Sequence, residues 1–175
     1  MNLDASILLW IQEHLRTPGM TVFFRQITRL GNAGIFWILL SLSLILFTKT
    51  RKTGGMAIIS LVISFVINNL FLKNVVARTR PYEVVEGLTR LIEKQPDYSF
   101  PSGHTASSFV VAMILYLELP KKYGIPLLVL AVLISFSRLY LGVHYPSDVL
   151  VGAVSGILIA LAVHRVFFHR QESEE

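Results

Sequence analysis

The sequence predicts an all-α, polytopic membrane protein, a helical bundle of about six helices. Composition is the first reason. Of 175 residues, 53% are hydrophobic and only 15% are charged, whereas an ordinary soluble domain carries roughly 25% charged residues. The second reason is that long apolar stretches recur between short polar loops, and irregular backbone cannot cross lipid. We therefore expect residues 1–175 to form one membrane domain.

The N-terminal segment, residues 1–31, allows two arrangements. Asp4 can cap a first amphipathic helix, which the Pro-Gly pair at 18–19 ends. A second short helix follows, with Arg25 and Arg29 one turn apart. The two pieces form either a kinked sixth span, which we favour, or a pair of amphipathic helices in the membrane interface.

The rest of the chain contains the clear spans. Five apolar stretches are found at 34–48, 55–72, 105–119, 124–141 and 149–168. A helical crossing needs about 20 residues, so the first and third stretches are expected to extend into flanking polar residues. The last five residues, 171–175, are expected to form a frayed acidic tail.

Loop charge predicts the orientation of the bundle. Basic residues lie in two loops and after the last span: Lys49, Arg51, Lys52, Lys121, Lys122, Arg165 and Arg170. Alternation along five spans puts all of them on one side, and loops rich in Lys and Arg face the cytoplasm. The segments 73–104 and 138–148 then face outward. We expect a multi-pass protein of the bacterial cell (inner) membrane with its polar clusters on the extracytoplasmic side.

The first polar cluster contains Lys73 and Arg80. The two cations are seven residues apart, so a continuous helix would place them on the same face, and Pro81 would then end that helix. Taken alone, cations at the end of a span more often reach toward lipid headgroups. Arg78 and Arg90 are assigned to that simpler role.

The second cluster is Pro101-Ser102-Gly103-His104, directly before the third span. Ser102 suits a helix N-cap, and Gly103 lets a bound group approach the backbone closely. Amides at a helix N-terminus bind anions, and His104 would point toward the same anion. A serine-glycine-histidine sequence in this position is also common as a plain helix cap.

The third cluster joins Arg138 to His144 and Asp148. Residues four apart share a helix face, and a carboxylate bonded to one imidazole nitrogen raises the basicity of the other. Such a histidine can act as a nucleophile toward phosphorus. A purely structural histidine–aspartate hydrogen bond at a helix start would give the same pattern.

Together the clusters supply three cations, two histidines and one carboxylate on one face. The cations Lys73, Arg80 and Arg138 would repel a metal ion and can stabilise anionic charge themselves, so no metal and no cofactor is expected. A nucleic-acid partner is not expected either, because no basic stripe exists outside the loops. The chain has no cysteine, which excludes thiol chemistry.

This three-part pattern resembles the signature of the type-2 phosphatidic acid phosphatase superfamily. The pattern runs from Lys73 to Asp148, and every signature position is present. The hydropathy excludes the soluble branches of the family. The small size is similar to compact bacterial members such as phosphatidylglycerophosphate phosphatase B and the undecaprenyl-diphosphate phosphatases.

The resemblance implies a role for each residue. His144 would attack phosphorus and form a phosphohistidine, Asp148 would orient His144, and His104 would protonate the leaving group and then activate water. The residues that would bind the phosphate are Lys73, Arg80, Ser102, Gly103 and Arg138. The residues alone leave open which histidine is the nucleophile, and the His144–Asp148 pairing is the physical reason for the choice.

The expected function is therefore metal-independent hydrolysis of a lipid phosphate or diphosphate that arrives from the bilayer. Phosphatidylglycerophosphate, phosphatidate and undecaprenyl diphosphate all remain candidate substrates, and no obligate protein partner is inferred. Two alternatives stay open. One is a lipid-phosphate transporter or binding protein without turnover, which would not need the His–Asp pair. The other is a transferase that uses the same residues to move phosphate to an acceptor other than water.

Overall fold

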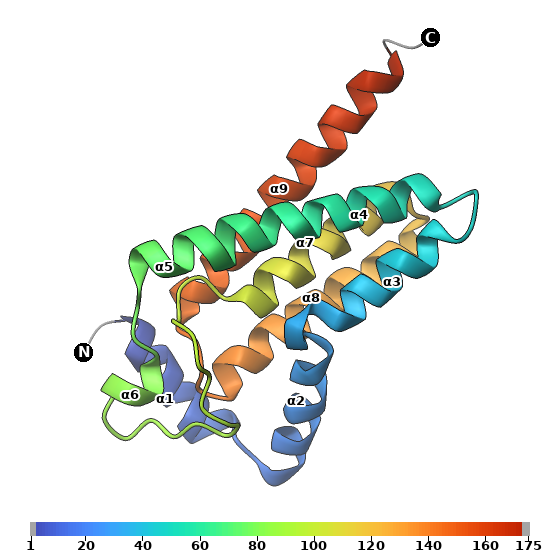
Figure 1. Ribbon diagram of the computed structural model, residues 1–175. Coiled ribbons are helices and arrows are strands. Elements are labelled where there is room, and N and C mark those ends of the chain that lie inside the picture. The colour runs from blue at the N-terminus through green and yellow to red at the C-terminus, as the bar shows by residue number, and fades with distance from the viewer. Residues whose placement is uncertain (1–2, 173–175) are drawn as a thin grey trace.

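The computed structural model describes residues 3–172, and over that range the chain is helical without strands, as predicted (Figure 1). The α-helices are α1 (Leu3–Leu15), α2 (Pro18–Leu30), α3 (Ile35–Ile45), α4 (Arg51–Ser64), α5 (Lys73–Val76), α6 (Pro81–Val84), α7 (Gly103–Glu118), α8 (Lys121–Tyr140) and α9 (Pro146–Glu172). A short 3₁₀ turn, Asn32–Gly34, joins α2 to α3, and a π-helical stretch, Phe65–Leu72, joins α4 to α5.

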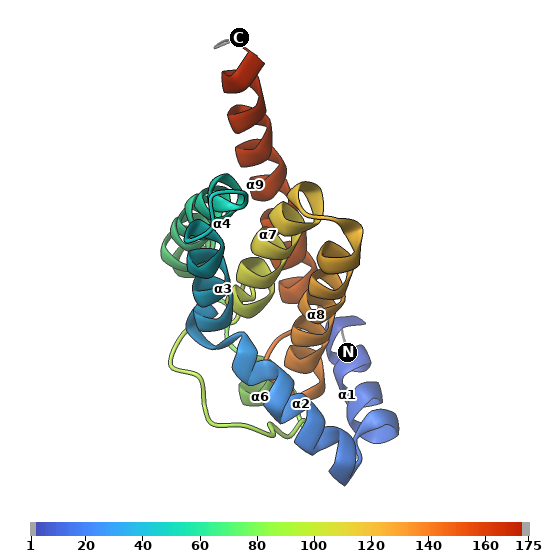
Figure 2. The ribbon, with the colours of Figure 1, turned by 90° about the vertical axis from the view of Figure 1, so that its right-hand side faces the viewer.

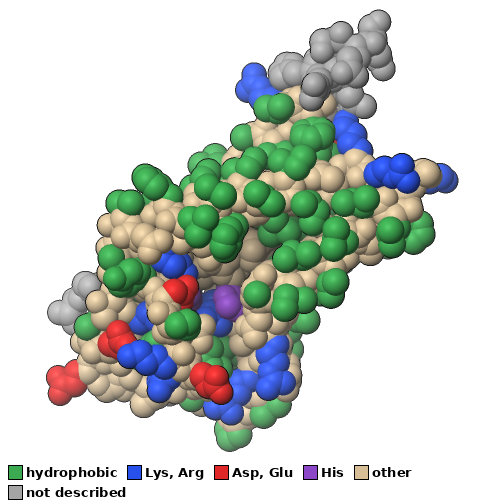
Figure 3. All heavy atoms as spheres, viewed as in Figure 1, with side chains coloured by type: hydrophobic (Ala, Val, Ile, Leu, Met, Phe, Trp, Pro, Cys, Tyr) green, Lys and Arg blue, Asp and Glu red, His purple; other side chains and the backbone are tan. Residues whose placement is uncertain are grey.

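Helix α7 lies inside the bundle, with α3 and α4 on one side and α8 and α9 on the other (Figure 2). Many of its apolar side chains are fully buried, including Val110, Val111 and Ile114. The outward faces of the surrounding helices instead expose large apolar side chains such as Leu39 and Val62, and Figure 3 shows the resulting apolar surface. An apolar exterior around a helical bundle is what a lipid environment requires.

Each predicted apolar stretch lies mostly in a helix, but the helices differ in length. The extension expected for the first stretch is wrong, because α3 ends at Ile45, and the third gains only Gly103 and His104 at its start. By length and composition, three helical segments of the described chain can cross a membrane: 51–84, 121–140 and 146–167. A fourth is possible if α2 and α3 count as one span bent by 42°. Helices α3 and α7, with 11 and 16 residues, are shorter than a crossing of about 20.

The kink near the N-terminus lies in a different place from the one we favoured. In the described chain, the bent pair that is long and apolar enough to form one span is α2 with α3, not α1 with α2. The bend falls at Ala33 and Gly34, which both have positive φ. Helix α2 also exposes Arg25 and Arg29, so it adds little apolar length to α1.

The two ends of the bundle differ in character. Loop 77–102, α6 and α1 gather at one end, while the α3–α4 turn and the C-terminal part of α9 lie at the other (Figure 1). The tail expected at 171–175 begins inside α9, because Gln171 and Glu172 are helical. Residues 173–175 lie outside the described residues.

Two glycines bring α9 into backbone contact with α7. A Cβ at Gly152 would lie 2.8 Å from the Ser102 carbonyl oxygen, and one at Gly156 would lie 2.7 Å from that of Ala106. Small residues four apart allow this close approach between membrane helices. The contact holds the start of α9 against the start of α7, where the second and third polar clusters lie.

Candidate active site

The predicted site residues converge at the loop end of the bundle around a cavity of about 880 Å³. Those that line it are Lys73, Arg80, Gly103, His104, Arg138 and His144. Ser102 and Asp148 are fully buried beside it. Figure 3 shows basic, acidic and histidine side chains gathered around a hollow in this face. Sequence segments up to 75 residues apart, from Lys73 to Asp148, thus meet at one place.

Lys73 and Arg80 reach the cavity by a different route from the one predicted. The continuous helix we expected is wrong, because α5 ends at Val76 and Ala77 takes a left-handed conformation with φ 46°. Arg80 has an extended backbone, and Pro81 starts α6 instead of ending a helix. Proline is favoured at the first helical position, and the residue before it is held extended. The two cations meet through the loop, not through a helix face.

His144 is oriented by groups on both of its ring nitrogens. Its Nδ1 lies 3.4 Å from Asp148 Oδ2, and its Nε2 lies 3.3 Å from Arg80 Nη1. Because a guanidinium only donates hydrogen bonds, Nε2 must accept and the ring proton belongs on Nδ1, facing Asp148. The nitrogen that faces the cavity therefore carries a lone pair.

The surroundings of His144 also keep the ring neutral. Burial lowers the pKa of His144 to about 3, and the charges of Arg138 and Arg80 act in the same direction, while Asp148 opposes them. An imidazole that stays unprotonated at neutral pH is available as a nucleophile.

Asp148 has more partners than the sequence indicated. Its Oδ2 accepts from Ser99 Oγ at 2.5 Å and from the Tyr145 amide at 2.9 Å. Its Oδ1 accepts from Arg78 Nη1 at 2.7 Å, and Arg78 also binds Asp4 at 2.8 Å. The assignment of Arg78 to lipid headgroups is therefore wrong. No local pattern marks this contact, since 70 residues separate Arg78 from Asp148.

The three cations, Lys73, Arg80 and Arg138, form a cradle that we call the cation cradle. All three are nearly fully buried. Lys73 and Arg80 both pair with Asp97. Arg138 donates from Nη1 to Thr28 Oγ1 at 2.7 Å, and its buried Nε has no partner among the described residues. An unpaired buried donor of this kind is costly unless a ligand satisfies it.

The second polar cluster lies at the start of α7 and lines the same cavity. Ser102 is the N-cap of α7, as predicted, and accepts from the Thr105 amide. A Cβ at Gly103 would lie 2.9 Å from Asn69 Nδ2, so glycine leaves room there. His104 Nε2 lies 3.0 Å from Asn32 Oδ1. Neither asparagine was predicted. Asn69 lies in the π-helical stretch, a distortion that often marks functional sites, and Asn32 lies at the α2–α3 bend.

Comparison with known proteins shows the family of this chain. The family model of the PAP2 superfamily matches residues 53–172. An undecaprenyl-diphosphatase of Sulfolobus acidocaldarius is 40% identical over 159 residues, which is 91% of this chain and 75% of that protein.

Two solved structures are also similar. Aquifex aeolicus LpxE has a TM-score of 0.83 and 29% identity, covering 94% of this chain and 96% of that one. A transmembrane PAP2-type phosphatidylglycerolphosphate phosphatase from Bacillus subtilis has a TM-score of 0.75 and 28% identity, covering 95% of this chain and 85% of that one. The chain therefore belongs to the PAP2 superfamily, as one of its membrane lipid phosphatases.

Proposed function

We propose that the protein hydrolyses the terminal phosphate of a lipid phosphate or diphosphate through a phosphohistidine on His144. The observation that carries this proposal is the orientation of His144. Its Nε2 carries a lone pair and lies beside Arg80 of the cation cradle, while Nδ1 faces a buried carboxylate. A transporter or binding protein needs the cations but gains nothing from such a histidine.

The proposed reaction has two steps. In the first, His144 Nε2 bonds to phosphorus, the bond from phosphorus to the lipid oxygen breaks, and His104 gives that oxygen a proton. In the second, His104 takes a proton from water, the hydroxyl bonds to phosphorus, and the phosphorus–nitrogen bond breaks to release inorganic phosphate. Asp148 stabilises the charged imidazole between the steps.

The cation cradle stabilises the charge that spreads over the non-bridging oxygens in each transition state. Ser102 and the Gly103 amide, at the N-terminus of α7, add to this. Because the cradle supplies positive charge without a metal, we propose that activity survives chelation.

The lipid tail would occupy the apolar part of the same cavity. Beyond the cradle the cavity is lined by Ile38 and Leu42 of α3, by Ile58 and Leu61 of α4, and by Phe65 of the π-helical stretch. A substrate could therefore enter sideways from the bilayer between α3 and α4. Undecaprenyl diphosphate is the first substrate to test, since the 40% identical relative is an undecaprenyl-diphosphatase. An apolar groove discriminates by only about 1–3 kcal/mol per methylene, so we expect loose chain specificity.

We also propose that residues 1–175 act as one domain in the cell membrane, with the cavity on the extracytoplasmic side. Basic residues of the α3–α4 turn and of the start of α8 support this orientation, because they lie at the end opposite the cavity (Figure 1).

The test is phosphate release by detergent-purified protein from a panel of lipid phosphates and diphosphates, with a chelator present. His144→Ala serves as the inactive variant, and His14→Ala, at an exposed histidine of α1, is the matched control. Release by the wild type and by His14→Ala, and none by His144→Ala, supports the proposal. A magnesium requirement would contradict the metal-free reaction. Binding without release would favour the transport alternative, and phosphate transfer to an added alcohol in place of release would favour the transferase.

A further inference from the structure

An acidic residue outside the family signature lies in the cation cradle. Asp97 Oδ1 accepts from Arg80 Nη2 at 2.6 Å, and Asp97 Oδ2 accepts from Lys73 Nζ. The carboxylate thus bridges two of the three cations, and its side chain is 45% exposed at the mouth of the cavity. A bidentate carboxylate on two cations resembles the way in which two phosphate oxygens would be held.

Every N–H group of the Arg80 guanidinium has a hydrogen-bond acceptor. Nε donates to the Asp97 carbonyl, and Nη1 reaches the Val143 carbonyl and His144 Nε2. Nη2 reaches Asp97 Oδ1 and, at 3.3 Å, the Tyr98 carbonyl. Each nitrogen therefore has as many acceptors as hydrogens. A phosphate oxygen can bond to Arg80 only if one of these acceptors leaves.

The Asp97 carboxylate is the one anionic acceptor on Arg80 among the described residues, so a phosphate can replace it with the same kind of charge. The backbone carbonyls of Asp97 and Val143 hold the guanidinium at 2.8 Å each, so Arg80 stays oriented without the carboxylate. The carboxylate in turn is on an exposed side chain that needs only a rotation to leave. Asp97 is ionised at neutral pH: burial alone would raise the pKa of its carboxyl, but Lys73 and Arg80 lower it below its ordinary value.

We propose that Asp97 is an internal competitor of phosphate, which occupies Lys73 and Arg80 in the empty site, leaves as the substrate phosphate binds and returns as inorganic phosphate departs. This inference rests on the proposed function in taking phosphate as the anion. Like charges at contact distance repel strongly, so carboxylate and phosphate cannot share the two cations. Arg138, whose Nε is unpaired, would make the first contact with the entering phosphate.

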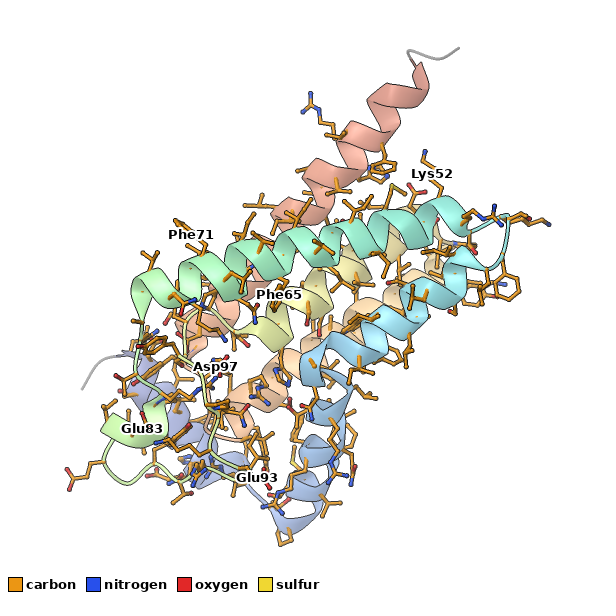
Figure 4. All side chains as sticks on the ribbon, in the orientation of Figure 1. Lys52, Phe65, Phe71, Glu83, Glu93 and Asp97 are labelled. Carbon is orange, nitrogen blue, oxygen red and sulfur yellow. The ribbon has the colours of Figure 1, made fainter. Side chains whose placement is uncertain are left out.

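The competition has two physical consequences. Without phosphate, Asp97 pairs with two cations and offsets part of their repulsion for each other and for Arg138. In the product complex it weakens the hold of the cation cradle on inorganic phosphate, which would otherwise remain bound and inhibit the next turnover. Of the acidic residues in loop 77–102, which the structure describes throughout, only Asp97 lines the cavity. Figure 4 shows Glu83 and Glu93 farther from the helical bundle than Asp97.

The test measures phosphate binding directly, apart from turnover. Equilibrium dialysis with radiolabelled inorganic phosphate is carried out on detergent-purified wild type, Asp97→Asn and Glu93→Gln. The last variant loses the same charge from the same loop without the contact. We expect Asp97→Asn to bind phosphate about tenfold or more tightly than the wild type, and Glu93→Gln to bind within about twofold of it.

Thermal unfolding of the same samples provides a second readout. Asp97→Asn should unfold at a lower temperature than the wild type without phosphate, and saturating phosphate should raise its unfolding temperature by more. Weaker or unchanged phosphate binding in Asp97→Asn, in protein that still unfolds cooperatively, would overturn the proposal and make Asp97 a residue that positions the cations. If Glu93→Gln bound phosphate as tightly as Asp97→Asn, the proposal would also be overturned, because the loss of one negative charge anywhere in the loop would then explain the tighter binding.

These outcomes are separable from the fate of the proposed function. If the wild type hydrolyses lipid phosphates but Asp97→Asn binds phosphate no more tightly, the competition fails and the enzyme assignment stands. If Asp97→Asn binds phosphate more tightly but the wild type hydrolyses no lipid phosphate, the proposal for Asp97 stands and the proposed hydrolase function is wrong.

Discussion

Helix α9 carries Asp148 and is pressed against the loop that carries Ser102, and Gly152 makes this contact possible. A Cβ at position 152 would lie 2.8 Å from the Ser102 carbonyl oxygen and 3.2 Å from Thr105 Cβ. The first distance is too short for a real Cβ, and the atom it meets is backbone that cannot rotate away. In Gly152→Ala the two helix starts must therefore separate by several tenths of an ångström.

The separation should affect catalysis as well as folding. Gly152 lies one turn beyond Asp148, whose carbonyl accepts from the Ser102 amide at 3.1 Å. Overpacking costs about 1–3 kcal/mol of stability. A misplacement of about 1 Å can cost about 100-fold in rate, so we expect kcat/KM to fall roughly 10- to 100-fold.

Gly55 in α4 provides the matched control, because no atom lies within 4 Å of a Cβ there. Gly55→Ala should keep full activity and gain about 0.5–1 kcal/mol from helix propensity. The assays are phosphate release from a lipid diphosphate and thermal unfolding in detergent. If Gly152→Ala were as active as Gly55→Ala, the close approach of α7 and α9 would not position the site.

Three further predictions concern the groups around the nucleophile. Asp148→Asn should fold and bind substrate but lower kcat by about 10³- to 10⁴-fold, by analogy with the loss of a triad carboxylate, and an unchanged kcat would make Asp148 structural. Arg78→Ala removes the partner of Asp148 Oδ1. It should lower the free energy of unfolding by about 1–3 kcal/mol, because Arg78 is only 27% exposed and water screens the ion pair little, and it should also slow turnover. The exposed Arg90→Ala is its control, and equal effects in the two would show that Arg78 has no special role. The third prediction is a pH dependence of stability. Unfolded His144 gains a proton near pH 6.5 while the folded ring stays neutral down to about pH 3, so stability should fall by about 2 kcal/mol from pH 7 to pH 5. The His144→Gln variant should not lose this part of its stability between pH 7 and pH 5. If the wild type and His144→Gln lost stability identically with falling pH, the prediction would be contradicted.

Much of the candidate site could be predicted because its chemistry is carried by residue types at fixed spacing. His144 and Asp148 are four residues apart, and Ser102 caps the helix that follows it, so local geometry was enough to relate them. The fold class followed from composition in the same way. The prediction failed where the conformation depends on a single residue. The helix expected from Lys73 to Arg80 ends at Val76 because Ala77 is left-handed, a conformation that the high helix propensity of alanine does not predict.

Contacts between segments that are distant in the sequence could not be predicted from it. Arg78 meets Asp148, and Asp97 meets Lys73, only because loop 77–102 folds back over the cavity. The sequence shows that the loop contains both basic and acidic residues, but it does not show which of them form ion pairs. Asn32 and Asn69 contact the second cluster from a bend and a π-helical stretch, and neither distortion has a pattern that marks it in advance.

The central claim is that the phosphoryl group passes through His144. The most direct measurement is to mix purified protein with a lipid diphosphate radiolabelled at the terminal phosphate, quench with alkali within one turnover and count label on the protein. A phosphohistidine survives alkali, so we predict label on the wild type and none on His144→Ala. If the wild type released phosphate without ever carrying label, or if His144→Ala still carried it, the account of the nucleophile would be contradicted.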